Sequence, residues 1–233
     1  MNKENIWFIT AKTNLHVGNE NTSSYGLIDL AVQRNATTDL PCINSSSLKG
    51  ALNEYAALKA KLDSEALLNI FGSDKVKGDG RSKDTKKGKY TFFDANILFL
   101  PKQSDTKLYE LVTCDAVLKH FISQVELLTK GSVTIDEDSL LNTFKAKKVS
   151  DKEFKDLCSD DNLPIIARNV LENGESKNLW YEQVVPAETV FYTFIDSCND
   201  NTLTNLLTAN NTLVQIGANA TIGYGYCKFT NLK

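Results

Sequence analysis

The chain is organised around two neighbouring stretches, Gly26-Leu27-Ile28-Asp29-Leu30-Ala31-Val32-Gln33-Arg34 and Pro41-Cys42-Ile43-Asn44-Ser45-Ser46-Ser47-Leu48-Lys49-Gly50. In the first stretch a single carboxylate, Asp29, stands in an apolar run that Arg34 closes. In the second, a serine cluster leads through Lys49 into a segment with helical spacing of apolar residues. A helix start with free N–H groups and a lysine suits phosphate binding. The same pattern also fits a capped surface helix with a solvated lysine, so both interpretations stay open at this point.

Total composition indicates an ordinary globular protein. The chain has 233 residues, of which 42% are hydrophobic and 24% charged, enough for one large domain or one domain with a sizeable insertion. No apolar run approaches the roughly 20 residues that a membrane span needs. The polar segment 1–7 does not resemble a signal peptide, so we expect a cytoplasmic protein that does not contact a membrane.

Cysteine usage points to a reducing compartment. The five cysteines are scattered, their number is odd and no Cys-x-x-Cys occurs. This pattern disfavours both a disulfide framework and a zinc site.

The charge of the chain is unevenly distributed. Net charge is −3, which by itself disfavours a nucleic-acid binder, but residues 75–89 contain seven Lys or Arg and two Asp. We therefore expect a basic loop at 74–89, with several glycines and no apolar periodicity, to be mobile and to lie on an otherwise acidic body.

Strands and helices alternate without a strict β-α rhythm. Strands are predicted at 4–14, 90–100 (ended by Pro101), 108–113 and 188–196, with a last strand reaching Phe229. Helices are predicted from Ser46 with the serines as caps, at 64–71 with Ser64 as cap and Gly72 as terminator, and at 115–130, with an acidic helical pattern over 136–162. This order favours an α+β fold with an antiparallel sheet and is compatible with a ferredoxin-like core bearing insertions.

Two further segments carry a local signal. Asn173-Gly174 between two β-like runs predicts a hairpin over 164–182, which places Arg168 on its first strand. Near the C-terminus, Gly217, Gly223 and Gly225 lack the spacing of a dinucleotide fingerprint or a P-loop. They indicate either a bend in a strand or a loop laid against a nucleic-acid backbone.

Taken together, six motifs in order along the chain resemble one family, the backbone subunits of type III-B (Cmr) CRISPR effector complexes in the RAMP superfamily. The motifs are His16-x-Gly18, the run 26–34, the run 41–50, Phe71-Gly72, Leu179-Trp180-Tyr181-Glu182 and the glycine-rich segment 215–225. They extend from the first predicted strand to the last.

The resemblance implies a fold and an assembly. A single RAMP domain would occupy 1–233, with a ferredoxin-like, RRM-like palm, a helical insertion at 115–162 and a β-hairpin thumb at 164–182. Copies would stack into a helical filament along a CRISPR guide RNA, together with other effector subunits. Target single-stranded RNA would pair with the guide, and each thumb would interrupt the duplex where the target is cut.

The resemblance also implies site residues for a metal-dependent endoribonuclease. Catalysis would involve Asp29, His16 and Glu182, with a divalent cation, Mg²⁺ or Mn²⁺, held transiently by Asp29 together with RNA. One carboxylate is too few for an all-protein magnesium site, so RNA phosphates and water would complete the shell. Expected RNA contacts are Lys49, Arg34, Ser45, Ser46, Ser47, Arg168, Trp180, Gly217, Asn219, Thr221 and Gly223.

The sequence departs from the family pattern in two ways. The acid that follows Trp-Tyr-Glu in the family is Gln183 here. The loop between His16 and Gly26 and the chain before the Trp-Tyr motif also differ in length, which leaves thumb details open. Two alternatives remain: a catalytically inactive, architectural guide-binding subunit that needs no Asp29, or a stand-alone guide-processing enzyme, which would need a well-placed histidine base.

Overall fold

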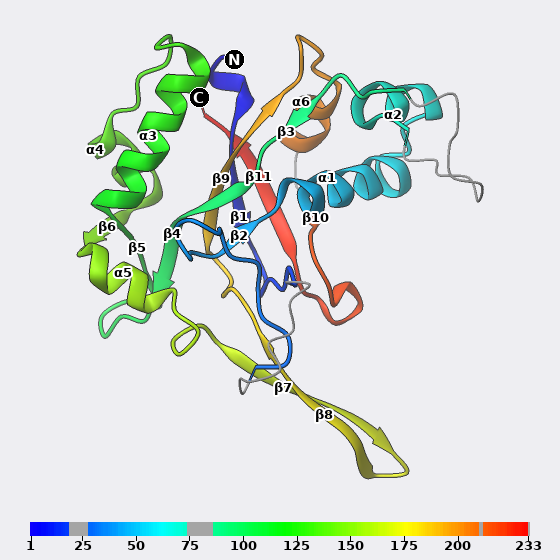
Figure 1. Cartoon of the computed structure of the whole chain (residues 1–233), viewed down its shortest axis with the longest axis vertical. Coiled ribbons are helices and arrows are strands. Elements are labelled where there is room, and N and C mark those ends of the chain that lie inside the picture. Colours follow the sequence, from blue (N-terminus) through cyan, green and yellow to red (C-terminus); the bar gives the residue numbers. More distant parts are fainter. Residues whose placement is uncertain (19–27, 74–85, 210–211, 233) are drawn as a thin grey trace.

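A nine-stranded, mainly antiparallel sheet runs through the molecule, with helices on both faces (Figure 1). The computed structural model describes residues 1–18, 28–73, 86–209 and 212–232, and all structural statements concern these. The strand order is β10-β11-β1-β9-β4-β5-β6, with β2 on β4 and β3 on β9. The strands are β1 Ile6–Ala11, β2 Cys42–Ile43, β3 Thr91–Phe92, β4 Ala95–Lys102, β5 Glu110–Cys114, β6 Ala146–Val149, β9 Val190–Asp196, β10 Val214–Gln215 and β11 Tyr226–Asn231.

The centre of this sheet is a ferredoxin-like unit. Its four strands lie in the order β11-β1-β9-β4, every neighbouring pair antiparallel. Helix α1 (Ser45–Glu54) follows the first strand and α6 (Thr202–Thr208) follows the third. The connection between β4 and β9, a tight hairpin in the simplest version of this fold, here contains an insertion and the projecting hairpin. The predicted α+β class with an antiparallel sheet is therefore confirmed.

Helices cover both faces because the central strands are apolar on both. In Figure 1, α1, α2 (Ser64–Phe71) and α6 lie on one side, and α3 (Asp115–Thr129), α4 (Glu137–Phe144) and α5 (Asp151–Leu157) on the other. Five of the six residues of β1 are buried. Phe8 illustrates the packing: its ring centroid lies 5.9 Å from that of Phe121 on α3 and 5.1 Å from that of Phe144 on α4. No described helix combines the length and the apolar character that crossing a bilayer would require.

The helix starts differ from the predicted caps. Helix α1 begins at Ser45, so the serines lie inside its first turn, and the preceding Asn44 makes no side-chain cap. Instead the Ser45 N–H donates to Oδ1 of Asp94 at 2.6 Å. For α2 the cap is Asp63, not Ser64, whereas the predicted terminator Gly72 is confirmed, with φ of 80°. Carboxylates outside the helices thus satisfy the free N–H groups that the serines were expected to cap.

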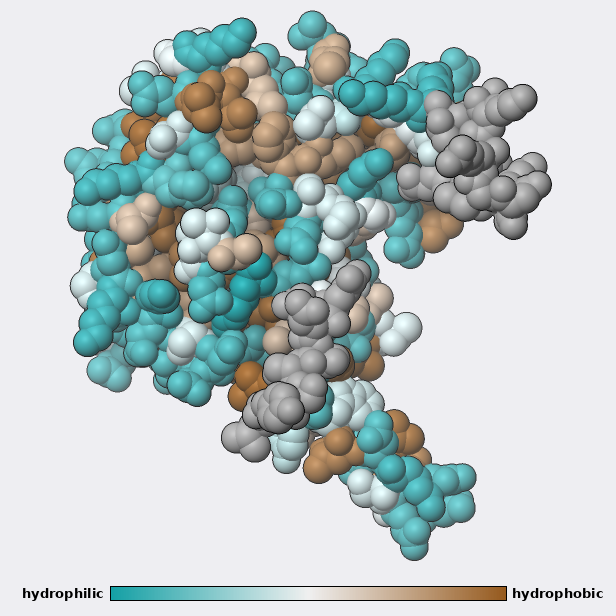
Figure 2. Space-filling view, viewed as in Figure 1, coloured by the Kyte–Doolittle hydropathy of each residue, from teal (hydrophilic) through white to brown (hydrophobic). Residues whose placement is uncertain are grey.

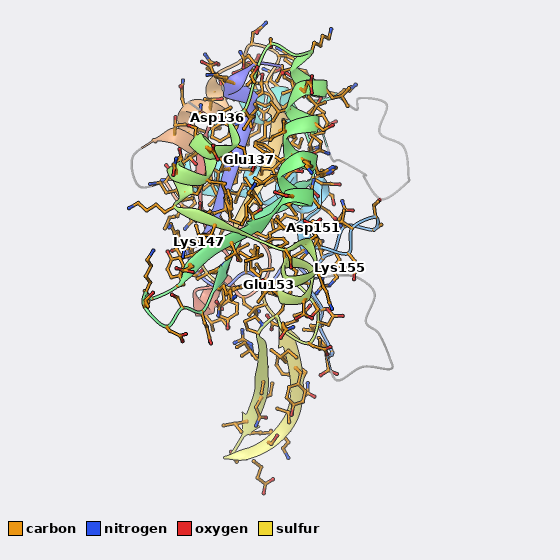
Figure 3. All side chains as sticks on the ribbon, turned by 90° about the vertical axis from the view of Figure 1, so that its left-hand side faces the viewer. Asp136, Glu137, Lys147, Asp151, Glu153 and Lys155 are labelled. Atoms are coloured by element: carbon orange, nitrogen blue, oxygen red, sulfur yellow. The ribbon has the colours of Figure 1, made fainter. Side chains whose placement is uncertain are left out.

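The sequence pattern predicts a helical insertion over 115–162, but the region is not wholly helical. It contains β6, which pairs in parallel with β5 and forms one edge of the sheet. Ion pairs cover this edge, Lys147 to Glu110 at 2.7 Å and Lys148 to Glu137 at 2.6 Å. Figure 3 labels Lys147 and Glu137 on this side of the molecule. Charged side chains protect an exposed edge from pairing with other strands. The long neighbouring strand β4 also continues through Pro101, so the proline does not end it as predicted.

The predicted hairpin is confirmed as β7 (Ile165–Glu172) and β8 (Glu175–Gln183). Asn173 and Gly174 have φ of 53° and 87°, the left-handed pair that a two-residue hairpin turn favours. The hairpin projects from the palm, and Figure 2 shows apolar surface along it. Its exposed apolar residues include Ile165, Val170, Leu171 and Leu179.

Two expectations fall outside the described residues. Of the basic loop at 74–89, only 86–89 are described, so its predicted mobility stays a prediction. Residues 19–27, which include the start of the first opening stretch, also lie outside the described residues.

Candidate RNA-processing site at the base of the hairpin

Four segments far apart in sequence meet where the hairpin joins the palm: 14–18, 28–34, 180–183 and the glycine-rich segment 216–225. Backbone hydrogen bonds join them. The Ala218 N–H donates to the His16 carbonyl at 2.9 Å, and the Gln183 N–H donates to the Leu30 carbonyl at 2.9 Å. The Gly225 N–H donates to the carbonyl of residue 14 at 2.8 Å. The sequence motifs therefore converge on one place in the fold.

Asp29 is an exposed carboxylate held in place by the hairpin. Its Oδ2 accepts a hydrogen bond of 2.7 Å from the backbone N–H of Tyr181, and its own N–H donates to the Tyr181 carbonyl at 3.0 Å. The next residue, Leu30, forms a parallel bridge with Glu182. The segment carrying Asp29 is thus paired with the end of β8, and the second carboxylate oxygen, Oδ1, accepts no hydrogen bond from described residues.

Beneath Asp29 lies a buried polar cluster that contains Glu182, His16, Asn219 and Arg168. Glu182 is 2% exposed, and its Oε1 accepts a hydrogen bond from Asn219 Nδ2. The same oxygen lies 3.7 Å from His16 Nδ1, while Oε2 lies 3.4 Å from Arg168 Nε. A buried carboxylate requires such partners, because an unpaired buried charge is costly. The cluster joins β7, β8 and two palm loops.

The ring of His16 is fixed in one orientation. Its Nδ1 lies 2.7 Å from the carbonyl oxygen of Gln183. A carbonyl oxygen only accepts, so Nδ1 carries a hydrogen and donates it. A Cβ added at Gly18 would lie 3.1 Å from His16 Nε2, which explains why a glycine follows the histidine so closely.

Arg168 stacks under the glycine-rich segment. Its guanidinium carbon lies 4.7 Å from the centre of the Tyr224 ring, a cation–π contact. Across the hairpin, Arg168 is paired in register with Trp180, which is half-buried. Among described residues, Nε and Nη2 of Arg168 are buried without a hydrogen bond.

The glycine-rich segment is closely packed at both ends, at Gly217 and Gly225, and is open at Gly223 between them. Gly217 has φ of 81°, and a Cβ there would collide with the His16 carbonyl oxygen. Asn219 is left-handed, with φ of 66°, and leads into a short turn that exposes Thr221. Gly223 has φ of 83°, but nothing lies within 4 Å of a Cβ built there. The segment therefore both bends tightly and presents an accessible surface.

The family model of the RAMP superfamily matches residues 8–228. This chain belongs to the RAMP superfamily. It is 28% identical, over an alignment 266 positions long, to the CRISPR system Cmr endoribonuclease Cmr4 of Pyrococcus furiosus, covering 88% of each protein. It is 34% identical over 96 residues to the CRISPR system Cms endoribonuclease Csm3 of Streptococcus thermophilus, covering 37% of this chain and 41% of that protein.

Solved structures share the fold. A chain of the type III-B Cmr-beta complex bound to cognate target RNA superposes with a TM-score of 0.76 at 18% identity, covering 97% of this chain and 96% of that one. Oligomeric Cmr4 from Pyrococcus furiosus superposes with a TM-score of 0.67 at 23% identity, covering 98% of each chain. The resemblance to Cmr backbone subunits drawn from the motifs is thus confirmed, and so is the RAMP palm.

Other predicted residues of this RAMP protein lie on α1 and beside it. Lys49 is half-buried on α1, and no ion pair found among the described residues involves it. Gln33 joins the two opening stretches: its Nε2 donates to Ser47 Oγ at 3.0 Å, and its Oε1 accepts from the Asn44 N–H at 2.8 Å. Ser46 is exposed, and Ser45 and Ser47 are partly buried. The helix start is therefore fixed to the segment that carries Asp29.

Arg34 is turned into the protein. Its side chain is 14% exposed, Nη1 donates to the Asp39 carbonyl at 2.7 Å, and Nη2 pairs with Asp160 Oδ1 at 2.7 Å. Among the described residues, neither Arg34 nor Lys49 makes a direct hydrogen bond or ion pair with the Glu182 cluster. The structure thus brings together His16, Glu182, Arg168 and Asn219, with Asp29 next to them along β8.

Sequence reasoning missed several residues that build this site. Gln183 is completely buried, and its side chain joins Val32 to Asp160. The Tyr181 backbone and the Tyr224 ring were missed as well. Only the departure from the family pattern at Gln183 pointed to any of them; a backbone amide and an aromatic ring offer no sequence signal of this kind.

No described group of three or more His, Cys, Asp or Glu side chains could hold a metal ion. Asp29 offers one carboxylate oxygen that accepts no hydrogen bond from the part of the chain that the structure describes. A divalent cation prefers six or more oxygen ligands. The described residues therefore fit a cation only as one that is shared with bound RNA.

Proposed function

We propose that this RAMP protein is a guide-RNA-binding backbone subunit of a type III-B CRISPR effector complex that cuts guide-paired target RNA at Asp29. The observation that carries the proposal is the exposed carboxylate of Asp29, fixed at the root of a projecting hairpin by the Tyr181 N–H. The likeness over nearly the whole chain to an endoribonuclease of a Cmr system supports it.

The hairpin supplies the geometry that cutting needs. Attack by a 2′-hydroxyl on the adjacent phosphate requires an in-line arrangement, which a stacked A-form nucleotide does not adopt. A ribbon inserted into the guide–target duplex unstacks one nucleotide at its base. There, Asp29 Oδ1 orients the 2′-hydroxyl and accepts its proton, while Oδ2 stays bound to the hairpin. The 2′-oxygen bonds to phosphorus as the bond from phosphorus to the 5′-oxygen of the next nucleotide breaks. The products are a 2′,3′-cyclic phosphate and a 5′-hydroxyl, whose proton comes from water.

A divalent cation, Mg²⁺ or Mn²⁺, would be held by Asp29 Oδ1 together with RNA phosphate oxygens and water. When bound, it supplies positive charge to the phosphate that is cut. With the cation bound, Asp29 Oδ1 would be a ligand of the cation and not the proton acceptor. The protein's own contribution would then be to fix the position of this carboxylate.

The guide strand follows the surface formed by α1 and the glycine-rich segment. The side chain of Lys49 and the N–H groups at the start of α1 favour phosphate oxygens. Asp94 already accepts the Ser45 N–H, so the guide phosphate sits nearer Ser46 and Ser47 than the very end of the helix. The exposed Thr221 and open Gly223 lie on the glycine-rich segment and offer a second backbone contact.

His16 and Glu182 are buried side chains that hold Asp29 in position without touching RNA. Both are almost completely buried, at 3% and 2% exposure, so neither presents a proton donor or acceptor to RNA. Their burial supports a positioning role, in which they hold the two palm loops and β8 together beneath Asp29. Arg168 and Asn219 complete the same cluster.

Further copies of this chain and other effector subunits are the protein partners in this proposal. The structural likeness to oligomeric Cmr4 and to chains of a Cmr complex supports it. The exposed apolar side chains of the hairpin support it too, since an isolated two-stranded hairpin is marginal in water.

One observation favours the architectural alternative. Asp29 already has a structural task, because its Oδ2 binds the hairpin backbone. The test is therefore Asp29→Asn in the assembled complex, since an asparagine keeps the acceptor oxygen but not the charge. Loss of cutting with intact assembly supports the catalytic proposal. Unchanged cutting would leave the subunit architectural.

A further inference from the structure

Both roots of the hairpin are tied to the palm by one set of side chains. By roots we mean the start of β7 and the end of β8. Asp160 lies between the end of helix α5 and the start of β7, and Gln183 is the last residue of β8. These two residues contact each other directly: Gln183 Nε2 donates to Asp160 Oδ1 at 3.0 Å. The hairpin's own ladder pairs Ile165 with Gln183, and the side-chain contact adds a tie between the end of β8 and the segment that precedes β7.

Arg34 completes this set, which we call the root latch and define as Arg34, Asp160 and Gln183. Arg34 Nη2 donates to the same oxygen of Asp160 at 2.7 Å. Its Nη1 donates to the Asp39 carbonyl at 2.7 Å, so one guanidinium joins the loop after Arg34 to the insertion. A planar guanidinium with two fixed acceptors holds its position better than a single-point contact.

Gln183 joins the latch to the segment that carries Asp29. Its Oε1 accepts from the Val32 N–H at 3.2 Å, and its own N–H donates to the Leu30 carbonyl at 2.9 Å. Its carbonyl accepts from His16 Nδ1. Leu30 and Val32 lie within three residues of Asp29 in the sequence, and His16 belongs to the buried Glu182 cluster.

The surroundings of Asp160 favour the charged form of its carboxyl group. Partial burial raises the pKa of Asp160, but the hydrogen bond from Gln183 and the charge of Arg34 outweigh it, so the pKa is lowered. The carboxylate therefore stays charged at neutral pH, and Arg34 stays bound to it.

We propose that Arg34 is a positioning residue, which acts with Asp160 and Gln183 to fix the hairpin roots and so the phosphate at which the target is cut. The proposal rests on the proposed function. It replaces the expected role of Arg34 in RNA binding, for which a side chain only 14% exposed and bound twice within the protein is poorly suited.

The two roles predict different results in the complex reconstituted with guide RNA and its other subunits. For a latch, Arg34→Gln and Asp160→Ala each lower the cutting rate about tenfold and spread cuts over neighbouring phosphates, because small misplacements are costly. The double variant is no worse than the more severe single variant, since both remove one interaction. Guide affinity and its salt dependence stay as in the wild type. Asp161→Asn, the neighbouring exposed acid, serves as control.

For a phosphate ligand, Arg34→Gln would weaken guide or target binding and reduce the slope of log affinity against log salt by roughly 0.7. Asp160→Ala would then leave the cut positions unchanged. Either finding overturns the proposal.

A swap of polarity gives a test that does not depend on removing a side chain. Gln183→Glu places a carboxylate where Nε2 now lies 3.0 Å from Asp160, and the two acids repel. Adding Asp160→Asn reverses the donor and acceptor and restores cut positions, if the latch sets them. Failure of the double variant to recover, with the complex intact, counts against the latch.

Failure of the proposed function is distinguishable from failure of the latch. If the wild-type complex does not cut RNA, hydrogen exchange of the β7 and β8 amides in that complex still tests the latch. Exchange should be faster in Arg34→Gln and Asp160→Ala than in Asp161→Asn. Equal exchange in all three would show that these residues do not hold the hairpin.

Discussion

The carboxylate of Asp29 accepts a hydrogen bond of 2.7 Å from the backbone N–H of Tyr181. A residue in the first part of the chain is thereby joined to a strand formed more than a hundred residues later. The contact uses one carboxylate oxygen and leaves the other to act on a ligand. It makes the place of Asp29 dependent on the hairpin.

Replacing Asp29 separates its two tasks. Asp29→Asn should lower the rate of target cutting at least about a hundredfold, because the negative charge that accepts the proton or binds a cation is gone. Assembly and guide binding should persist, since the amide oxygen still accepts from Tyr181. Cutting is measured by gel analysis of labelled target RNA, and assembly by sedimentation. Asp29→Ala should lose the hairpin contact as well.

Removing the carboxylate of Glu182 should destabilise the palm. Glu182→Ala leaves Arg168 and Asn219 without their buried partner, at a cost of about 3 kcal/mol in the free energy of unfolding. Glu153→Ala, which breaks a surface ion pair with Lys102, should cost much less, because solvent screens exposed charges. Denaturant unfolding measures both. Equal effects would contradict the cluster as a source of stability.

The two glycines of the C-terminal segment should respond differently to alanine. Gly217→Ala should cost about 3 kcal/mol, because a left-handed backbone combines with a collision at the His16 carbonyl. Gly223→Ala should cost about 1 kcal/mol, because its surroundings are open. Thermal unfolding of the two variants provides the comparison, and the reverse order would refute this account of the loop.

Neutralising Lys49 should weaken guide binding in a salt-dependent manner. Lys49→Gln should reduce the slope of log affinity against log salt by roughly 0.7, the value for one phosphate contact on a single strand. The exposed Lys119 on α3, across the sheet from α1, is the matched control. Filter binding at several salt concentrations measures both. A slope equal to that of the wild type would place Lys49 away from the guide.

Acid should release the root latch. The folded-state pKa of Asp160 is lowered, so its charge stabilises the fold above the ordinary value of 3.8. That stability is lost as the pH falls through the folded-state pKa. The difference in unfolding free energy between wild type and Asp160→Asn should therefore shrink below about pH 4. A difference that is constant from pH 7 to pH 3 would contradict the ion pair with Arg34.

The fold was largely predictable because its signals are local. The Asn173-Gly174 turn, the apolar periodicity of α3 and the Gly72 terminator depend on a few adjacent residues. The strand β6 was missed because its four residues follow a helix directly and pair with a distant strand.

The site was predictable by motif and not by geometry. The motifs identified Asp29, His16 and Glu182, but which residues are buried depends on how four segments, one of them the end of β8, meet in the fold. Arg34 illustrates this limit. An arginine next to a motif that suits phosphate binding predicts an RNA contact, whereas in the fold Arg34 pairs with Asp160 of the insertion. Only the tertiary arrangement decides between these two partners.

The position of β1 has a consequence for how the chain acquires its structure during synthesis. Ile9, on the first strand, pairs with Phe191 on one side and with Phe229 on the other. The emerging N-terminal segment therefore stays without either neighbour until almost the whole polypeptide has left the ribosome. Such non-local pairing slows folding and leaves apolar strands exposed meanwhile. We expect nascent chains of this protein to depend on chaperones, and truncated chains that end before β9 to aggregate.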